Sequence, residues 1–317
     1  MANEFAIIDQ YFTAIGQPAV STILGIGDDA AVVEVPAGQQ LVVSMDTLIA
    51  GTHFPADTSP EDIAYKSLAV NLSDLAAMGA SPAWFLLSLT LEDSKSGWLS
   101  KFATGLRETA DAFGLQLIGG DTCRGKLAIS IQIAGHVPRN RFVTRHGASV
   151  GDIILVSGEL GNAALGLAQK QGKVDLPSAL QAECALALNR PQPRLELAPF
   201  LREFATSAVD VSDGLVGDLR HLLDASNCGA RIERVALPVN AWIVEHNRYD
   251  YALDAGDDYQ ICCTVAADNR AEIDRWNRDH PNCRLTAIGE IIESGYSMSD
   301  GKGLVDLGKR QGYRHFD

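Results

Sequence analysis

The sequence lacks the basic excess, the long apolar segments and the paired cysteines that mark several large classes of protein. Its 26 lysine and arginine residues are outnumbered by 40 aspartate and glutamate residues, which gives a formal net charge of −14. A chain with this charge has no general basic surface, so we expect neither nucleic acid nor an anionic membrane as a partner. The apolar stretch over residues 75–91 is interrupted by Gly79 and Pro82, and no segment is typical of a transmembrane helix.

The cysteines and the first residues give two further negative indications. None of the six cysteines forms a C-x-x-C pair, and a chain of 317 residues can build a core without disulfides, so we expect reduced thiols. The first residues lack a basic segment followed by an apolar one, so we expect no signal peptide. Both observations predict a cytoplasmic protein.

Length and patterning predict an α/β protein with two domains. Hydrophobic residues make up 46% of the chain, enough for extensive cores. In the first half, helices are expected at about 4–15, 60–78 and 98–113, and strands at 31–35, 41–44, 83–91, 115–118 and 127–137. In the second half, helices are expected at about 161–171, 178–189, from 213 and at 268–279, and strands at 153–156, 205–210, 259–265 and 284–291. The small, glycine-rich segment at 146–152 predicts a boundary between domains 1–147 and 148–317.

Carboxylates recur in five apolar or glycine-rich settings, most of them beside predicted strands. They are the pair Asp28 and Asp29, then Asp46, Asp74 and Asp121, and finally the pair Asp210 and Asp213. Most of them, taken singly, are explained as turn residues or helix caps. Asp74 is the exception, because an acid within an apolar helix has no local structural use, and Asn71 shares its helix face.

An unpaired buried carboxylate is unfavourable by several kcal/mol, whereas several carboxylates can share a hard cation. We therefore interpret the five settings together as a magnesium site, through which an acidic protein binds an anionic substrate. Arg145, at the predicted domain boundary, has the planar group that suits phosphate oxygens, although a plain surface arginine is as good an explanation. His53 follows the Asp46 segment and is a candidate ligand contact, although a lone histidine is more often structural.

One motif is a false signal for a dinucleotide site. Gly25-x-Gly27-x-x-Ala30 fits the fingerprint of dinucleotide-binding folds, and Asp46 follows at a suitable distance. However, Asp28 and Asp29 would repel a pyrophosphate without intervening metal ions, and the following residues are typical of a strand rather than a phosphate-binding helix. The sequence also lacks a P-loop, the protein-kinase motifs, a G-x-S-x-G elbow and a zinc pattern.

Six motifs in order along nearly the whole chain resemble those of the thiamine-monophosphate kinase family, within the aminoimidazole-ribonucleotide-synthetase-like superfamily. They are Gly-Ile-Gly-Asp-Asp-Ala at 25–30, Asp-Thr-Leu at 46–48 with Gly51-x-His53-Phe54, Ala-Val-Asn-Leu-Ser-Asp-Leu-Ala-Ala-Met-Gly at 69–79, Gly-Gly-Asp-Thr at 119–122, Asp-Val-Ser-Asp-Gly-Leu at 210–215 and Gly-Tyr-x-His-Phe at 312–316. The blocks at 71–79 and 210–215 are the specific ones.

The resemblance implies an α/β fold of α+β layers and a homodimer. In it, the N-terminal domain binds ATP and Mg²⁺ and pairs with that of a second copy in a β-barrel-like interface, and the C-terminal α/β sandwich domain completes the active site. The implied reaction is direct transfer of the γ-phosphoryl group of ATP to thiamine monophosphate, assisted by several Mg²⁺ ions.

Residue roles are implied motif by motif. The implied metal ligands are Asp28, Asp29, Ser44, Met45, Asp46, Asp74, Asp121, Asp210 and Asp213, and we expect Asp46, Asp74, Asp121 and Asp210 to carry catalysis. The implied ATP contacts are Gly120, Asp121, Arg145 and Ser212, and the implied substrate contacts are His53, Asp257 and Tyr313.

Two positions depart from the family pattern. Met45 stands where the family often has threonine, so a metal contact there must come from the backbone carbonyl. Asp257 stands where the family has glutamate and is one methylene shorter.

The alternatives are another ATP-dependent synthetase of the superfamily, a non-catalytic divalent-cation-binding protein and an NAD oxidoreductase. A selenophosphate synthetase would need a reactive cysteine near the N-terminus, whereas the first cysteine here is Cys123.

Overall fold

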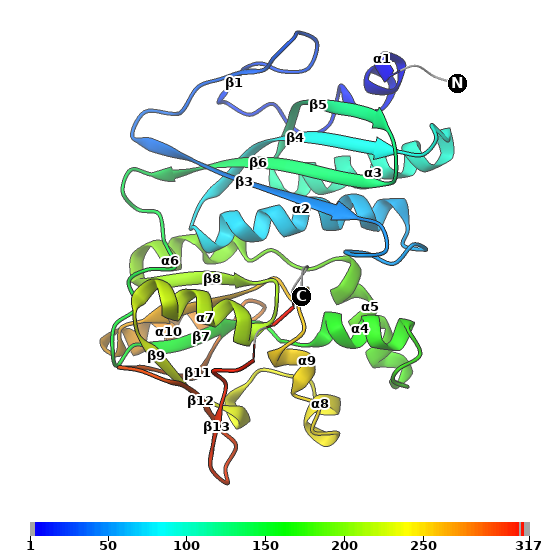
Figure 1. Cartoon of the computed structure of the whole chain (residues 1–317). Coiled ribbons are helices and arrows are strands. Elements are labelled where there is room, and N and C mark those ends of the chain that lie inside the picture. Colours follow the sequence, from blue (N-terminus) through cyan, green and yellow to red (C-terminus); the bar gives the residue numbers. More distant parts are fainter. Residues whose placement is uncertain (1–3, 311, 314–317) are drawn as a thin grey trace. The chain divides into compact units, whose positions relative to one another are not determined.

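The chain forms two compact units, each with its own sheet and helices (Figure 1). The computed structural model describes residues 4–310 and 312–313. Unit 1 comprises Met1–Leu75 and Ala80–Arg141, and unit 2 comprises Ala76–Gly79 and Phe142–Asp317. The predicted α/β fold class is confirmed.

Unit 1 is a four-stranded sheet with two long helices. Its strand order is β3-β6-β4-β5, in which β4 and β5 are parallel and the other pairs are antiparallel. The elements are α1 (Glu4–Ile7), a π-helical turn η1 (Ile8–Phe12), β1 (Thr22–Leu24), β2 (Val32–Val33), β3 (Gln39–Ile49), α2 (Pro60–Ala77), β4 (Ser81–Leu91), α3 (Ser96–Phe113), β5 (Gln116–Arg124) and β6 (Ala128–Pro138).

Local sequence explains how α2 begins and why it is buried. Pro60 occupies the start of the helix, Glu61 and Asp62 follow in its first turn, and the Ser59 hydroxyl accepts the backbone N–H of Asp62. Leu68 and Leu72 are fully buried, and burial of each such side chain contributes roughly 2 kcal/mol. This packing fixes the helix that carries Asn71 and Asp74.

Strand β3 shows the strict alternation of a half-covered sheet. Its even-numbered residues are partly or fully buried, whereas its odd-numbered residues are exposed. The exposed set includes Leu41, Val43, Met45 and Ile49, with exposed fractions of 39, 48, 60 and 44%. One face of this edge strand is therefore an uncovered apolar row.

Unit 2 is a seven-stranded sheet with the order β13-β12-β9-β11-β7-β10-β8. Neighbouring strands are antiparallel except for the parallel pair β12 and β9. Its strands are β7 (Ile153–Ser157), β8 (Ala205–Val211), β9 (Gly229–Glu233), β10 (Gln260–Val265), β11 (Leu285–Ile292), β12 (Tyr296–Ser299) and β13 (Leu304–Asp306). Its helices are α4 (Asn162–Lys170), α5 (Ser178–Asn189), α6 (Ala198–Phe204), α7 (Leu215–Ser226), α8 (Ala241–Glu245), α9 (Asp250–Leu253) and α10 (Arg270–Asp279), with 3₁₀ turns η2 (Leu195–Leu197), η3 (Arg234–Ala236) and η4 (Ala267–Asn269).

Helices cover both faces of the unit 2 sheet, because two separate clusters of buried residues pack against its strands. One cluster joins α7 residues such as Leu219 to Val209 and Ile232. The other joins Phe200 of α6 and Trp276 of α10 to the sheet. The arrangement is an α/β sandwich in which the start of α7 is held against the end of β8.

In the described part of the chain, no helix combines the length and the apolar character that a membrane span requires. All six cysteines are free thiols. Burial raises the pKa of Cys263 to about 12, so this thiol stays protonated and packs as an apolar side chain.

Candidate active site

The first group of candidate residues lies where α2 meets β3 in unit 1. The Ser44 hydroxyl donates to an Asp74 carboxylate oxygen at 2.5 Å, and the Asn71 side-chain oxygen accepts the backbone N–H of Asp46 at 3.1 Å. The prediction that Asn71 and Asp74 share a helix face is confirmed, since both contact β3. This edge-strand group presents a carboxylate, a hydroxyl and the strand backbone in one place.

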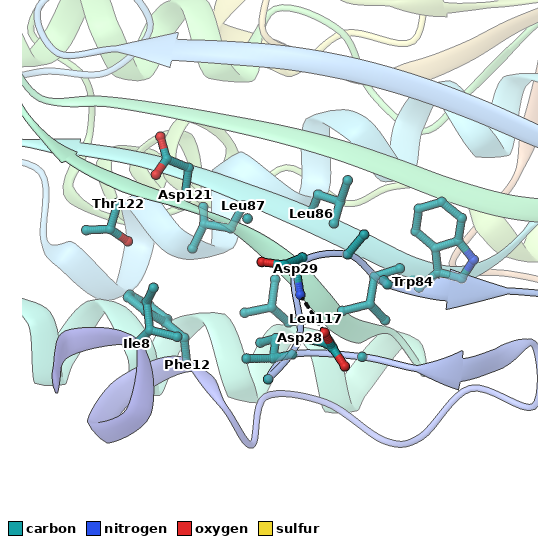
Figure 2. A pocket seen from close by; sticks show the side chains of 18 of the residues that line it. Ile8, Phe12, Asp28, Asp29, Trp84, Leu86, Leu87, Leu117, Asp121 and Thr122 are labelled. Carbon is teal, nitrogen blue, oxygen red and sulfur yellow. Dashed lines mark hydrogen bonds between the residues drawn. The ribbon is translucent and has the colours of Figure 1, made fainter. Parts of the chain in front are cut away.

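The second group of candidate residues lines a cavity of about 870 Å³ in unit 1. Figure 2 shows Asp121 and Thr122 towards one end, Trp84 at the other, and Asp28 and Asp29 on the loop between them. All three carboxylate residues, Asp28, Asp29 and Asp121, are exposed, and the backbone N–H of Asp29 donates to Asp28. The cavity therefore combines an apolar part with an acidic rim.

The predicted positions of these residues in their strands were partly wrong. The strand expected at 41–44 extends to residue 49, so Asp46 lies within β3. The strand expected at 115–118 extends to residue 124, so Gly120 and Asp121 lie within β5. Glycine and acidic residues suggested strand ends, but pairing with β6 and with β4 continues through them because their backbone groups complete the ladder.

Strand pairing places the two groups at opposite edges of the unit 1 sheet. Asp46 pairs with Ile131 of β6, Ile131 with Leu87 of β4, and Leu87 with Gly120 of β5. At about 4.8 Å per strand, the two edges are roughly 14 Å apart. Within residues 4–310 and 312–313, no three acidic, histidine or cysteine side chains are grouped closely enough to hold a metal ion by themselves.

Gly120 is required by strand packing. Its φ is +152°, and an added Cβ would lie 1.8 Å from the Leu87 carbonyl oxygen. Glycine alone lets β5 approach β4 at this point, immediately before Asp121.

In unit 2, the candidate residues gather around the loop 212–214 between β8 and α7. The Ser212 carbonyl oxygen accepts the backbone N–H of Asp257 at 2.9 Å, and the Asp213 carbonyl oxygen accepts that of Tyr313 at 2.9 Å. Asp210 precedes the loop on β8 and is 5% exposed. The structure thus joins three stretches that are far apart in sequence, whereas His315 and Phe316 of the terminal motif lie outside the described residues.

Asp218 is a residue of this loop region that the sequence analysis missed. It lies on α7, is 3% exposed, and one of its carboxylate oxygens accepts the backbone N–H of Asp213 at 2.9 Å. Burial raises the pKa of Asp218 to about 7, and the positive charge of Arg145 acts in the opposite direction. Arg145 is therefore within electrostatic reach of the loop. An acid in the first turn of the predicted helix was the available signal.

Two residues beside the loop adopt strained backbone conformations. Asp257 and Tyr259 have φ values of +72° and +49°, which are uncommon for residues with side chains. Between them, Asp258 is 6% exposed, and both of its carboxylate oxygens accept the backbone N–H of Gly161 at the start of α4. Strain of this kind is concentrated at functional sites, and here the Tyr259 hydroxyl donates to an Asp257 carboxylate oxygen at 3.3 Å.

His53 lies in unit 1, in the turn after β3. Its Nδ1 accepts the backbone N–H of Ile49 at 3.0 Å, so the proton of the neutral ring is on Nε2. The carbonyl oxygen of His53 accepts the ammonium group of Lys66, a side chain that is 2% exposed. The sequence analysis did not identify Lys66, whose buried charge fixes this turn.

Comparisons with known proteins give consistent results for both units. Residues 27–137 match the family described as AIR synthase related protein, N-terminal domain, and residues 149–300 match AIR synthase related protein, C-terminal domain. The chain is 43% identical over 322 residues to thiamine-monophosphate kinase of Escherichia coli (strain K12), which covers 99% of this chain and 98% of that protein.

Two solved structures are also similar. The crystal structure of thiamine-monophosphate kinase from Stenotrophomonas maltophilia K279a has 41% identity and a TM-score of 0.82, and covers 93% of each chain. The structure of AaThiL complexed with AMPPCP and TMP has 29% identity and a TM-score of 0.77, and covers 99% of this chain and 97% of that one.

Proposed function

The chain belongs to the thiamine-monophosphate kinase family, and we propose that it transfers the γ-phosphoryl group of ATP directly to thiamine monophosphate, giving thiamine diphosphate and ADP. The observation that carries the proposal is the similarity over 99% of the chain at 43% identity. Phosphoryl transfer needs positioning and charge neutralisation more than covalent chemistry. The acceptor is itself a phosphate, so the site needs no strong general base.

The donor set of unit 1 fits magnesium. Mg²⁺ is usually held by one or two carboxylates with waters and substrate phosphates, so a cage of three protein side chains is not required. Asp74 with Ser44, and Asp28, Asp29 and Asp121 around the cavity, supply oxygen ligands of this type. Asp46, Asp210 and Asp213 are further proposed ligands, and Met45 would contribute only its backbone carbonyl, because a thioether is too soft a ligand for Mg²⁺. Bound Mg²⁺ neutralises phosphate oxygens and so reduces the repulsion between the two anionic substrates.

The proposed nucleotide contacts combine backbone and cationic groups. Gly120 and Asp121 border the cavity, whose apolar lining is suited to a flat base. Arg145 and Ser212 supply a guanidinium and a hydroxyl for phosphate oxygens. Positioning these oxygens in line with the acceptor is the main task of the chain's own residues.

The proposed contacts with thiamine monophosphate are His53, Asp257 and Tyr313. The thiazolium ring is cationic, so the aromatic face of Tyr313 and the carboxylate of Asp257 are suitable neighbours. The Nε2–H of His53 is a donor for a phosphate oxygen. The backbone N–H groups of Asp257 and Tyr313 donate to adjacent carbonyl oxygens of the loop 212–214, so a shift of this loop would move both residues.

The proposed homodimer follows from the open unit 1 sheet. In the proposed barrel, a two-fold axis along the barrel places the β3 edge of one copy beside the β5 edge of the other and covers the apolar row of Leu41, Val43, Met45 and Ile49. The Asp46 and Asp74 group would then face Asp121 of the second copy. In this arrangement each magnesium site is completed by two chains, which accounts for the separation of the two groups within one.

The test is to incubate the protein with ATP, Mg²⁺ and thiamine monophosphate and to detect thiamine diphosphate by mass. Folded protein that gives no product in excess Mg²⁺ contradicts the assignment. Turnover of other phosphate acceptors but not thiamine monophosphate indicates another synthetase of the superfamily, and Ca²⁺ binding without nucleotide binding indicates a non-catalytic protein.

A further inference from the structure

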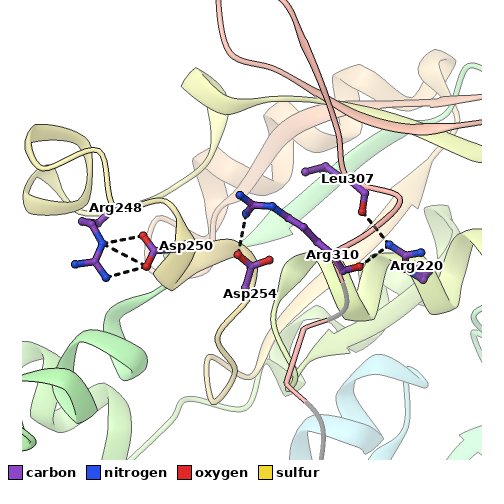
Figure 3. Close-up of polar contacts among 6 residues, drawn as sticks. All are labelled: Arg220, Arg248, Asp250, Asp254, Leu307 and Arg310. Atoms are coloured by element: carbon purple, nitrogen blue, oxygen red, sulfur yellow. Dashed lines mark hydrogen bonds and ion pairs between the residues drawn. The ribbon is translucent and has the colours of Figure 1, made fainter. Parts of the chain in front are cut away.

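The last described segment of unit 2 is tied to α7 through the side chain of Arg220. Its Nη2 donates to the carbonyls of Leu307 at 2.9 Å and Arg310 at 2.6 Å (Figure 3). Its Nη1 donates to the Gly308 carbonyl at 3.0 Å. One guanidinium thus holds three backbone carbonyls within four residues. Bonds from a charged donor are stronger than those between neutral groups.

A second tie holds the same segment from another element. The Arg310 guanidinium donates to an Asp254 carboxylate oxygen at 2.8 Å, just after α9. Leu307 is fully buried and its backbone N–H bonds to the Tyr296 carbonyl. The segment is therefore fixed from α7, from α9 and from β12 before it reaches Gly312.

Gly312 and Tyr313 lie against the loop 212–214. Gly312 has a φ of +63°, and an added Cβ would lie 2.7 Å from the Asp213 carbonyl oxygen. Tyr313 then donates its backbone N–H to that same oxygen. The backbone of Tyr313 is thus held at the loop 212–214, a few residues after the ties at residues 307–310.

We propose that Arg220 is a positioning residue: it orients Tyr313 for contact with the phosphate-bearing, cationic substrate, and it does not contribute to nucleotide binding. The proposal rests on the proposed function. Arg220 lies more than one helical turn beyond the loop 212–214. No motif of the sequence indicated this role for it. Arg310 and Asp254 support the same segment as the second tie.

The test compares Arg220→Met with Arg248→Met. Arg248 is a matched control in the same unit, since its guanidinium makes a two-point ion pair with Asp250 (Figure 3). We expect Arg220→Met to raise the KM for thiamine monophosphate about tenfold while the KM for ATP changes less than twofold. Hydrogen exchange of residues 304–313 should rise in the free protein, and Arg248→Met should match the wild type in each measurement.

A second variant, Arg310→Gln, keeps the proposal testable if Arg220→Met does not fold. It removes a partly exposed ion pair, so we expect the same pattern with a smaller rise in KM, about threefold. Faster exchange with an unchanged KM for thiamine monophosphate would overturn the proposal, as would equal rises in both KM values. A wild-type protein that makes no thiamine diphosphate contradicts the proposed function instead, and an active wild type with unaffected variants contradicts only the role of Arg220.

Discussion

Asp28, Asp29 and Asp121 of unit 1 are exposed around an open cavity, whereas Asp210, Asp218 and Asp258 of unit 2 are only 5, 3 and 6% exposed. The Asp218 and Asp258 carboxylates accept backbone N–H groups, of Asp213 and Gly161 respectively. Similar acidic motifs therefore serve different purposes. Exposed carboxylates keep their hydration and can exchange it for a cation, whereas the buried carboxylates of Asp218 and Asp258 hold backbone segments in place.

The sharpest test of this comparison is Asp74→Asn, which removes charge from the edge-strand group. We expect kcat to fall about a thousandfold, because an uncharged amide binds Mg²⁺ much more weakly than a carboxylate does, and less Mg²⁺ then stabilises the charge on the phosphates. Steady-state kinetics measures the fall, and Mg²⁺ titration followed by intrinsic fluorescence should show weaker binding. Asp111→Asn, an exposed change on α3, is the control, and wild-type turnover in Asp74→Asn would return Asp74 to a structural role.

A mixture of two inactive variants tests whether each site is formed by Asp46 of one copy and Asp121 of another, which lie at opposite edges of the unit 1 sheet. Asp46→Asn and Asp121→Asn should each be nearly inactive alone. If each site takes Asp46 from one copy and Asp121 from the other, mixed dimers hold one intact site, and an equal mixture should recover about one quarter of the wild-type rate. Absence of recovery after subunit exchange, verified by native mass spectrometry, would show that each site lies within one chain.

Gly120→Ala tests whether the close packing of β5 against β4, beside the acidic rim of the cavity, requires glycine. The added Cβ would overlap the Leu87 carbonyl, so we expect the free energy of unfolding to fall by about 3 kcal/mol. Urea unfolding measures it. Gly97→Ala in α3 meets no atom within 4 Å and should leave stability unchanged or raise it by up to ~1 kcal/mol. Equal stability of the two variants would disprove the packing argument for Gly120.

The smallest expected effect concerns the buried carboxylates of unit 2. Burial raises the pKa of Asp258 well above its usual 3.8, so the folded chain retains a proton that the unfolded chain releases near that pH. The free energy of unfolding should therefore decrease as pH rises above about 3.8, until the folded pKa is reached.

Asp258→Asn cannot titrate and should lose this decrease, and metal-free urea unfolding between pH 5 and pH 8 measures the difference. The exposed change Asp224→Asn should retain it. Identical pH profiles for Asp258→Asn and the wild type would rule out a protonated Asp258 in the folded state.

Elements with strong local signals could be predicted from the sequence. The cap and proline before α2 set its start, and the predicted helices at 161–171 and 178–189 match α4 and α5 within a residue or two. Short elements could not be predicted, since β9, β12 and β13 are held by pairing with distant strands. The helix expected at 4–15 is instead α1 followed by the π-helical turn η1, which ends at Phe12.

The site was predictable in its residue types but not in its grouping. Motifs identified Asp46, Asp74 and Asp121. Within one chain, however, the strand order places Asp46 and Asp121 at opposite edges of the unit 1 sheet, and no local pattern encodes that order. Arg220 was missed because its partners are backbone groups, which leave no trace in the sequence, whereas Asp218 left only the weak signal of an acid in the first turn of a helix. The assignment of individual ligands to metal, nucleotide and substrate stays a prediction.

The open sheet of unit 1 also has a consequence for handling the protein. β3 and the second half of β5 each have a single neighbouring strand, so an isolated copy exposes backbone groups that can pair with any passing strand. Dissociation of the proposed pair would expose both edges, so conditions that dissociate it at a fixed protein concentration favour irregular association. At one protein concentration, a variant that weakens the pair should therefore lose more recoverable protein on storage than the wild type.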